Sequence, residues 1–223
     1  MAQIEKYTYQ QACSLNANHI ARDEDNTRET HGNKEIDNSR THLNYSLFER
    51  NGYQDRQYLK QRLSEVAHIN RRDLNVSANI LITVPKEVPK NFQKQFFDEC
   101  LKWAQNRYGA KNVWQAWVHA DETNQHLHLG IIPTVDATKL QQSKGFSERL
   151  SFDERFSKRH EGANEYMLYH RSLQEHMINS KIPGADKVLN GATAKAGGNR
   201  SVRELKAERD YQHEHKYDHL RDR

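Results

Sequence analysis

The sequence predicts an α+β fold in which helices flank a largely antiparallel sheet. Two apolar and aromatic runs, residues 113–119 and 126–133, are joined by a short polar loop, which is the pattern of a β-hairpin. A third run at residues 78–84 is ended by Pro85, which cannot continue a hydrogen-bonded ladder. A helical pattern lies between this run and the hairpin, so the centre of the chain reads strand, helix, strand, strand.

The elements before this centre follow from local patterns. Residues 1–12 predict an initial strand or extended arm. Residues 16–40 are polar with almost no apolar side chains, which predicts a long loop, and long loops inside domains are usually functional. Residues 55–67 carry apolar side chains on one side at helical spacing, so we expect a helix there.

The remaining elements are a central helix and the segments after the hairpin. Asn91 is expected to cap the central helix, whose apolar positions recur every 3.6 residues, and Gly109 ends it. Residues 139–160 are polar and give no clear pattern, whereas residues 163–179 predict a further helix.

Two regions are expected along the chain. Residues 1–185 form the catalytic domain in this interpretation, and residues 186–223 form a glycine-rich loop followed by a charged helix capped by Ser201. That helix has too few apolar residues to bury much surface, so we expect it to start a longer C-terminal region that either pairs two copies or associates with a membrane.

Composition excludes some classes of protein. No stretch approaches the roughly 20 apolar residues of a membrane span, and the amino terminus has no apolar segment typical of a secretion signal. Cys13 and Cys100 are isolated, which favours thiols in a reducing, cytoplasmic compartment. The net charge of +4 comes from residues 139–223, with 17 Lys and Arg against 13 Asp and Glu. This balance is compatible with a nucleic-acid partner but does not establish one.

The hairpin carries a candidate metal site. Side chains alternate along a strand, so His126 and His128 share one face, and His119 ends the preceding strand close to His126. Three imidazoles therefore converge with a fourth coordination position open, as in catalytic rather than structural metal sites. The plainer alternative is two surface histidines on one strand.

Three imidazoles suit Mn²⁺, Zn²⁺ or Fe²⁺ better than Mg²⁺, which prefers oxygen ligands. In the hairpin loop, Asp121 or Glu122 would add an oxygen ligand, orient a histidine or act as a base, unless both are ordinary turn residues. A metal here would polarise a phosphoryl oxygen or activate a water.

The early polar segment offers a nucleophile. His19 is followed three residues later by Arg22, which pairs a nucleophile or acid–base group with a cation for a phosphate. This spacing alone is a weak signal, because ordinary surface residues show it more often than active sites do. Tyr45, Tyr53 and Tyr58 are further oxygen nucleophiles, although such tyrosines are more often packing residues.

Three motifs resemble those of one family. The run HADETNQHLHLGIIP resembles the metal motif H-x-D-E-x-x-P-H-x-H-x-x-x-x-P of the MobV-type (Pre/Mob) plasmid mobilisation relaxases, also called plasmid recombination enzymes. The matching positions are His119, Asp121, Glu122, His126, His128 and Pro133, while Gln125 replaces the usual proline. Ser39, Arg40, Thr41, His42, Leu43, Asn44 and Tyr45 resemble the second motif, and His19 with Arg22 resembles the first, HxxR. The resemblance covers roughly residues 1–140.

The resemblance implies an HUH-like relaxase fold and a metal-dependent DNA strand transferase. Such an enzyme binds single-stranded or hairpin DNA at a plasmid transfer origin, cuts one strand and keeps the 5′ phosphate covalently attached. It implies His19 as nucleophile, Arg22 as phosphate clamp and Glu122 as base or metal-assisting carboxylate. His119, His126 and His128 would hold the metal, with Mn²⁺ favoured over Mg²⁺ or Zn²⁺, and no small-molecule cofactor is expected.

Expected DNA contacts lie in two places, and two other functions stay open. Arg40, His42 and Asn44 of the second motif and Arg71 and Arg72 before the strand at 78–84 are the expected DNA-binding residues. A nuclease or phosphoesterase that activates water would form no covalent adduct. A non-catalytic DNA-binding module would hold a structural zinc through four protein ligands.

Overall fold

A five-stranded antiparallel sheet forms the centre of the protein. The computed structural model describes residues 2–21, 36–159 and 164–188. The strand order is β1-β3-β5-β4-β2, and each neighbouring pair is antiparallel. The strands are β1 (Ala2–Thr8), β2 (Tyr45–Ser46), β3 (Asn75–Thr83), β4 (Val113–His119) and β5 (His126–Ile131). The predicted α+β class with a largely antiparallel sheet is confirmed.

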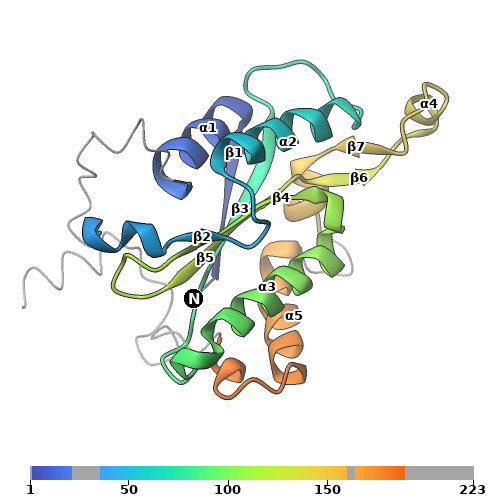
Figure 1. Cartoon of the computed structure of the whole chain (residues 1–223). Helices are drawn as coiled ribbons and strands as arrows, with labels where there is room; N and C mark the ends of the chain where they lie inside the picture. The colour runs from blue at the N-terminus through green and yellow to red at the C-terminus, as the bar shows by residue number, and fades with distance from the viewer. Residues whose placement is uncertain (1, 22–35, 160–163, 189–223) are drawn as a thin grey trace, which may run out of the picture. The chain divides into compact units, whose positions relative to one another are not determined.

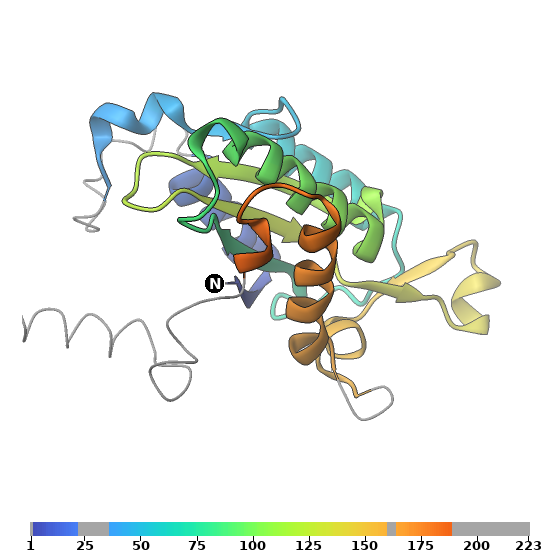
Figure 2. The ribbon, with the colours of Figure 1, turned by 90° about the horizontal axis from the view of Figure 1, so that it is seen from below.

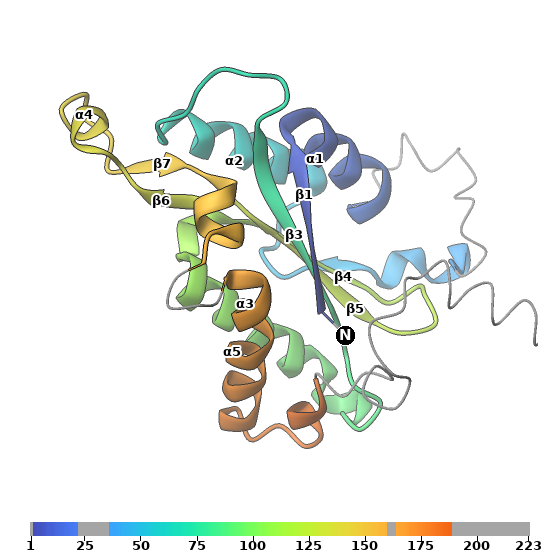
Figure 3. The same ribbon diagram turned by 180° about the vertical axis from the view of Figure 1, so that it is seen from behind.

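Helices cover both faces of this sheet (Figures 1 and 3). On one face lie α1 (Tyr9–Leu15) and α2 (Gly52–Ser64), which pack Ala12 and Leu59 against Trp114 of β4. On the other face lie α3 (Gln93–Tyr108) and α5 (Glu165–Asn179), seen in front of the strands in Figure 2. Apolar residues of β3 and β5 meet these two helices in the larger core.

Shorter elements complete the described part of the chain. An arm beside the sheet consists of β6 (Thr134–Asp136), α4 (Lys139–Gln142) and β7 (Glu148–Leu150) (Figure 1). The short helical turns are η1 (Asn16–Ile20), η3 (Asn38–Leu43), η4 (Lys90–Phe92), η5 (Ala110–Asn112), η6 (Asp153–Ser157) and η7 (Ala185–Lys187). None of the helices in residues 2–21, 36–159 and 164–188 is long and apolar enough to cross a membrane.

Several predicted boundaries were wrong for local reasons. The helix expected from residue 55 begins at Gly52, because Asn51 and Gln54 form a reciprocal capping box. Asn91 caps no helix: it lies in η4, and α3 starts two residues later. Gly109 does end α3, with a positive φ of 87° that favours glycine. The segment 139–160, which gave no pattern, contains α4, β7 and η6.

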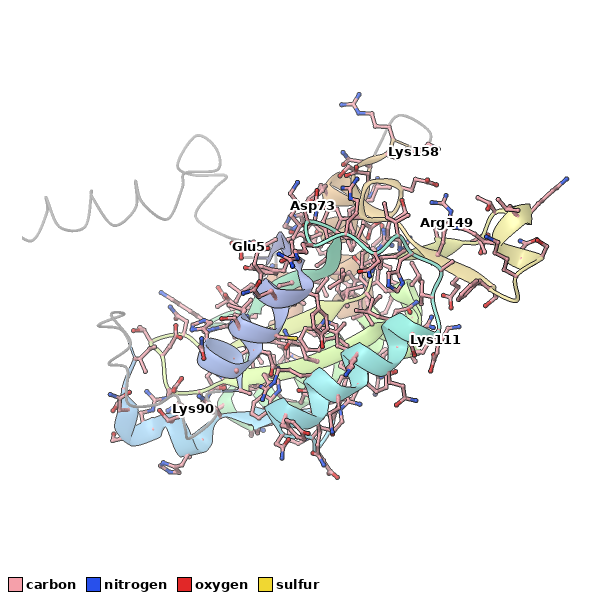
Figure 4. All side chains as sticks on the ribbon, turned by 90° about the horizontal axis from the view of Figure 1, so that it is seen from above. Glu5, Asp73, Lys90, Lys111, Arg149 and Lys158 are labelled. Atoms are coloured by element: carbon pink, nitrogen blue, oxygen red, sulfur yellow. The ribbon has the colours of Figure 1, made fainter. Side chains whose placement is uncertain are left out.

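One buried arginine ties the arm to α2. Arg62 is only 4% exposed and donates to Asn112 Oδ1 at 3.0 and 3.2 Å and to Glu148. Lys111 belongs to η5 and is labelled in Figure 4; its Nζ lies 2.5 Å from Glu148 Oε2. Burial alone would raise the pKa of Glu148, but hydrogen bonds from Lys111, Thr134 and Arg62 outweigh it and lower the pKa to about 2.

Replacing Glu148 with glutamine is expected to destabilise the protein by roughly 1–3 kcal/mol, because it leaves Arg62 buried beside a neutral group. The folded-state pKa is below the ordinary value of 4.5, so this stabilisation is complete above pH 4.5 and is lost as the pH falls towards 2. Chemical denaturation at pH 7 and pH 3 measures the difference. Glu65→Gln removes an exposed partner of Arg62 and should cost less than about 1 kcal/mol of stability. Equal losses of stability in the two variants would contradict the role of Glu148 as the main partner of Arg62.

Candidate functional site

The hairpin brings three histidines to the α1 face of the sheet. In the β4–β5 register, His119 pairs with His126 and Trp117 pairs with His128. Because side chains alternate, Leu127 and Leu129 enter the core under α3, and His126 and His128 point to the opposite face. The predicted pairing of the two strands and their alternation are both present.

The three imidazoles form a compact, buried cluster. The ring centroids are 4.7 Å apart for His119 and His128, and 5.0 Å apart for His119 and His126 and for His126 and His128. None of the three side chains is more than 7% exposed. Such burial leaves little water around the rings, which strengthens any interaction with a charge placed among them.

A fourth histidine joins the cluster from a distant part of the sequence. The chain continues from α1 directly into η1, and this turn carries His19 to 5.4 Å from the His119 ring and 5.5 Å from the His128 ring. A cavity of about 140 Å³ opens beside His19 and His128 and is also lined by Tyr7 and Glu5 of β1. Arg22, the second half of the HxxR motif, lies outside the described residues.

Among the described residues, two sets of three have the geometry to hold a metal ion. The ligand atoms of His19, His119 and His128 lie within 4.8 Å of one another, and so do those of His119, Glu122 and His126. His119 belongs to both sets. The set His119, His126 and His128 stays a prediction, and the geometry adds Glu122 and His19 as further candidate ligands.

Backbone carbonyls orient two of the imidazoles. The Nε2–H group of His119 donates to the carbonyl oxygen of Ile20 at 2.8 Å, and the Nδ1–H group of His126 donates to that of Asn124 at 3.0 Å. A neutral imidazole that donates from one nitrogen carries its lone pair on the other, which is how buried metal-binding histidines are usually fixed. In His119 that nitrogen is Nδ1, which lies 3.8 Å from Glu122 Oε1.

Glu122 carries a negative charge among these rings. The polar contact with His119, together with the charges of His126, His119 and His19, outweighs burial and lowers the pKa of Glu122 to about 2. The carboxylate is therefore ionised at neutral pH, and carboxylate with imidazole is a donor set that fits a divalent transition metal.

Asn79 of β3 is a site residue that no pattern in the sequence marks. Its Nδ2 lies 3.4 Å from His128 Nδ1, while its Oδ1 is buried without a hydrogen-bond partner among the described residues. A half-turn of the amide lets Oδ1 accept from the Nδ1–H group of His128, which satisfies the oxygen and leaves the lone pair of His128 on Nε2.

Asn79→Leu is expected to lower Mn²⁺ affinity about 10- to 100-fold, because His128 loses the acceptor that fixes its tautomer. Asn79→Asp keeps an acceptor at the same place and should retain the affinity of the wild type. Calorimetric titration with Mn²⁺ measures both variants. Equal affinity for Asn79→Leu and wild type would show that Asn79 does not orient His128.

The second sequence motif holds the hairpin loop in place. Asp121 is fully buried and accepts hydrogen bonds from Thr41 Oγ1 at 3.1 Å and Asn44 Nδ2 at 2.8 Å. Asn44 Oδ1 accepts from the Ala120 backbone N–H at 2.7 Å, and Arg40 donates to the Ala120 carbonyl oxygen. These contacts fix the loop between His119 and Glu122.

The five expected DNA-binding residues lie in two separate places. Arg40 and Asn44 contact the hairpin loop near the histidine cluster, and His42 is exposed beside them. Arg71 and Arg72 are exposed in the loop before β3, where their neighbour Asp73 is labelled in Figure 4. His126 pairs with Thr83 at the other end of β3, so this loop is roughly 25 Å or more from the cluster. The DNA contacts themselves stay predictions.

Two tyrosines, Tyr45 and Tyr7, are alternatives to His19 as the nucleophile, and they lie on opposite faces of the sheet. Tyr45 packs into the core under α3, on the opposite face of the sheet, and burial with the charge of Asp98 raises its pKa to about 12. Tyr7 lines the cavity beside His19, but burial and the hydrogen bond with Glu5 raise its pKa far above the ordinary value. Neither phenol is readily ionised at neutral pH.

Comparison with known families and proteins gives one consistent match. The family model described as plasmid recombination enzyme matches residues 1–175. Relatives named plasmid recombination enzyme come from Bacillus thuringiensis, 29% identical over 122 residues, and Streptococcus agalactiae, 32% identical over 113 residues. These alignments cover 52% and 47% of this chain but only 27% and 23% of the relatives, so the chain spans less than a third of their length.

The chain is also similar to solved structures of a relaxase domain. The Mn-bound MobM relaxase domain in complex with plasmid pMV158 oriT DNA superimposes with a TM-score of 0.64 at 24% identity, covering 93% of this chain and 97% of that one. The same domain bound to a DNA of 23 nucleotides gives a TM-score of 0.65 at 20% identity, covering 94% and 97%. At this identity the likeness establishes the fold alone.

Proposed function

This chain belongs to the plasmid recombination enzyme family, and we propose that it is a relaxase that nicks one DNA strand at a plasmid transfer origin. The observation that supports this proposal most strongly is the position of His19, whose ring lies 5.4 and 5.5 Å from two histidines of the candidate metal site. A nucleophile beside a buried metal site is the arrangement that covalent phosphoryl transfer needs.

His19 would form the covalent bond. A ring nitrogen of His19 attacks the scissile phosphorus, the bond from phosphorus to the 3′ oxygen breaks, and the strand leaves with a 3′ hydroxyl after taking up a proton. The 5′ phosphate stays on the protein as a phosphoramidate. Because the link conserves the energy of the broken bond, the reverse attack by a 3′ hydroxyl rejoins the strand.

The other residues prepare the phosphate and the site. His119, His126 and His128, with the Glu122 carboxylate, would hold a divalent ion, for which we propose Mn²⁺. When bound, this ion supplies positive charge next to the phosphate oxygens and so stabilises the transition state. Glu122 Oε1 lies 3.8 Å from His119 Nδ1 and its carboxylate belongs to one of the two candidate ligand sets, so we assign it to metal binding. Arg22 would pair with the phosphate.

A second candidate function rests on the same fourth histidine. The ligand atoms of His19, His119 and His128 lie within 4.8 Å of one another, so His19 could itself complete a closed set of imidazoles with His126. A closed site leaves no position for substrate and is typical of structural zinc. In that case the protein would bind DNA without cutting it. A hydrolytic nuclease, in which water replaces His19, is the other alternative.

An assay with end-labelled single-stranded DNA separates the three functions. The oligonucleotide spans the transfer origin of the plasmid that encodes this chain, and each reaction contains Mn²⁺ or EDTA. The relaxase predicts that a 3′-end label moves onto a protein band under denaturing conditions with Mn²⁺, while a 5′-end label appears on a free fragment. Cutting without a labelled protein band would indicate hydrolysis, and an uncut oligonucleotide would indicate a binding module.

The proposed DNA partner and domain limits follow from this function. We propose that single-stranded or hairpin DNA at the transfer origin is the substrate, and that residues 1–185 are sufficient to cut it. Pairing of two copies through residues 186–223 stays a prediction, since residues 189–223 lie outside the described part of the chain.

A further inference from the structure

An open groove lies between α1 and α2, on the same face of the sheet as the histidine cluster. The two helices lie side by side over the strands (Figure 4), and the space between them has a volume of about 730 Å³. Tyr9 and Cys13 line it from α1, and Tyr53, Arg56, Gln57 and Lys60 line it from α2. None of the motifs of the sequence falls in this groove.

The groove presents aromatic surface to solvent. Tyr53 is 60% exposed and Tyr9 is 40% exposed, which places both among the large exposed apolar side chains of the described residues. The Arg56 guanidinium lies 6.0 Å above the Tyr53 ring. Exposed tyrosines beside cations form the stacking platforms with which proteins bind unpaired nucleotides.

Charge in the groove favours an anionic partner. Arg56 and Lys60 are cations, the remaining lining groups are neutral, and no carboxylate lines the groove. A nucleic-acid strand matches this combination of groups, because it offers flat bases for Tyr53 and phosphates for the two cations.

A hydrogen bond connects the groove to η1, the helical turn that carries His19. Arg56 Nη1 donates to Asn16 Oδ1 at 2.8 Å, and Asn16 lies in η1, three residues before His19. Asn16 also donates to Gln115 of β4 at 2.7 Å, which fixes η1 against the sheet. Continuous helical backbone leads from Tyr9 to His19, about 15 Å at 1.5 Å per residue. A strand in the groove would therefore pass close to the histidine cluster.

We propose that the α1–α2 groove binds an unpaired segment of the DNA strand, with bases stacked on Tyr53 and Tyr9 and phosphates at Arg56 and Lys60. This inference rests on the proposed function as a DNA-cutting enzyme and adds a second contact region to it. Because stacking tolerates any base, the groove supplies affinity rather than recognition of sequence.

Binding of a fluorescein-labelled 20-nucleotide oligo-dT, followed by fluorescence anisotropy, tests the stacking contact. Tyr53→Ala is expected to weaken binding about 5- to 100-fold, and Tyr53→Phe should bind as wild type because the ring remains. Leu168→Ala, an exposed apolar position on α5 across the sheet, serves as the matched control. Thermal unfolding shows whether each variant is folded. Unchanged affinity of folded Tyr53→Ala, or no binding of oligo-dT to wild type, would overturn the inference.

The reactivity of the Cys13 thiol tests whether the DNA occupies the groove. It lines the groove, whereas Cys100, the second of the chain's two cysteines, is fully buried and burial raises the pKa of its thiol well above the ordinary value. Oligo-dT is expected to slow maleimide labelling of Cys13 in wild type. Full binding with unchanged labelling would place the DNA elsewhere and contradict the groove. The end-label assay for the covalent adduct tests the proposed function independently. If the groove does not bind DNA, a labelled protein band in that assay would still support the relaxase.

Discussion

His126→Ala is expected to abolish nicking that depends on Mn²⁺. The variant removes one of the buried imidazoles whose ring centroids lie 5.0 Å from those of both His119 and His128, and no neighbouring side chain on β5 can replace it because Leu127 faces the opposite core. Losing a direct ligand should cost more than the 10- to 100-fold typical of residues that only orient a ligand, so we expect Mn²⁺ affinity to fall more than about 100-fold.

Calorimetry with Mn²⁺ and the end-label assay measure the two consequences of His126→Ala independently. His68→Ala is the matched control, because His68 is exposed in the loop after α2 and its Nδ1 contacts only the local carbonyl oxygen of Val66 in the contacts described. Wild-type affinity for Mn²⁺ in His126→Ala would contradict the assignment of this residue. Retained affinity with lost nicking would assign His126 to the substrate rather than the metal.

His19→Ala is expected to lower the rate of adduct formation by a factor on the order of 10³ or more, as removal of a nucleophile does in other covalent enzymes. Its ring is half-buried and borders the cavity, unlike the fully enclosed His119. The nucleophile assignment therefore predicts that Mn²⁺ affinity and oligo-dT affinity stay within about threefold of wild type. A large fall in Mn²⁺ affinity would instead identify His19 as a fourth ligand of a closed site.

The local part of the site could be predicted from the sequence. Because side chains alternate along a strand, His126 and His128 must lie on the same face of the sheet. Because the loop is short, His119 lies opposite His126 on the neighbouring strand. These statements need only neighbouring residues, so the hairpin and its histidines were predicted correctly. The start of α2 was missed although its signal was present, since Asn51 and Gln54 carry the capping-box spacing.

Contacts between distant segments could not be predicted in the same way. His19 reaches His119 across 100 residues of sequence only because α1 packs on the sheet and continues into η1. Asn79 reaches His128 because β3 pairs with β5, and nothing in the surrounding residues marks it. The second motif predicts DNA contacts, which stay predictions, but it gave no sign that Thr41 and Asn44 also bond the buried Asp121. These roles depend on contacts between segments that are far apart in the sequence. A local sequence pattern does not specify such contacts.

The measurement that tests the covalent mechanism most directly is mass spectrometry of the adduct. The protein is trapped on the transfer-origin oligonucleotide with Mn²⁺, trimmed with nuclease and digested with trypsin at alkaline pH, because a phosphoramidate hydrolyses in acid. The tryptic peptide of residues 7–22 contains Tyr7, Tyr9 and His19, so fragment ions locate the nucleotide within it. The proposed mechanism predicts the nucleotide on His19, whereas a nucleotide on Tyr7, on Tyr45 or on no residue at all would contradict it.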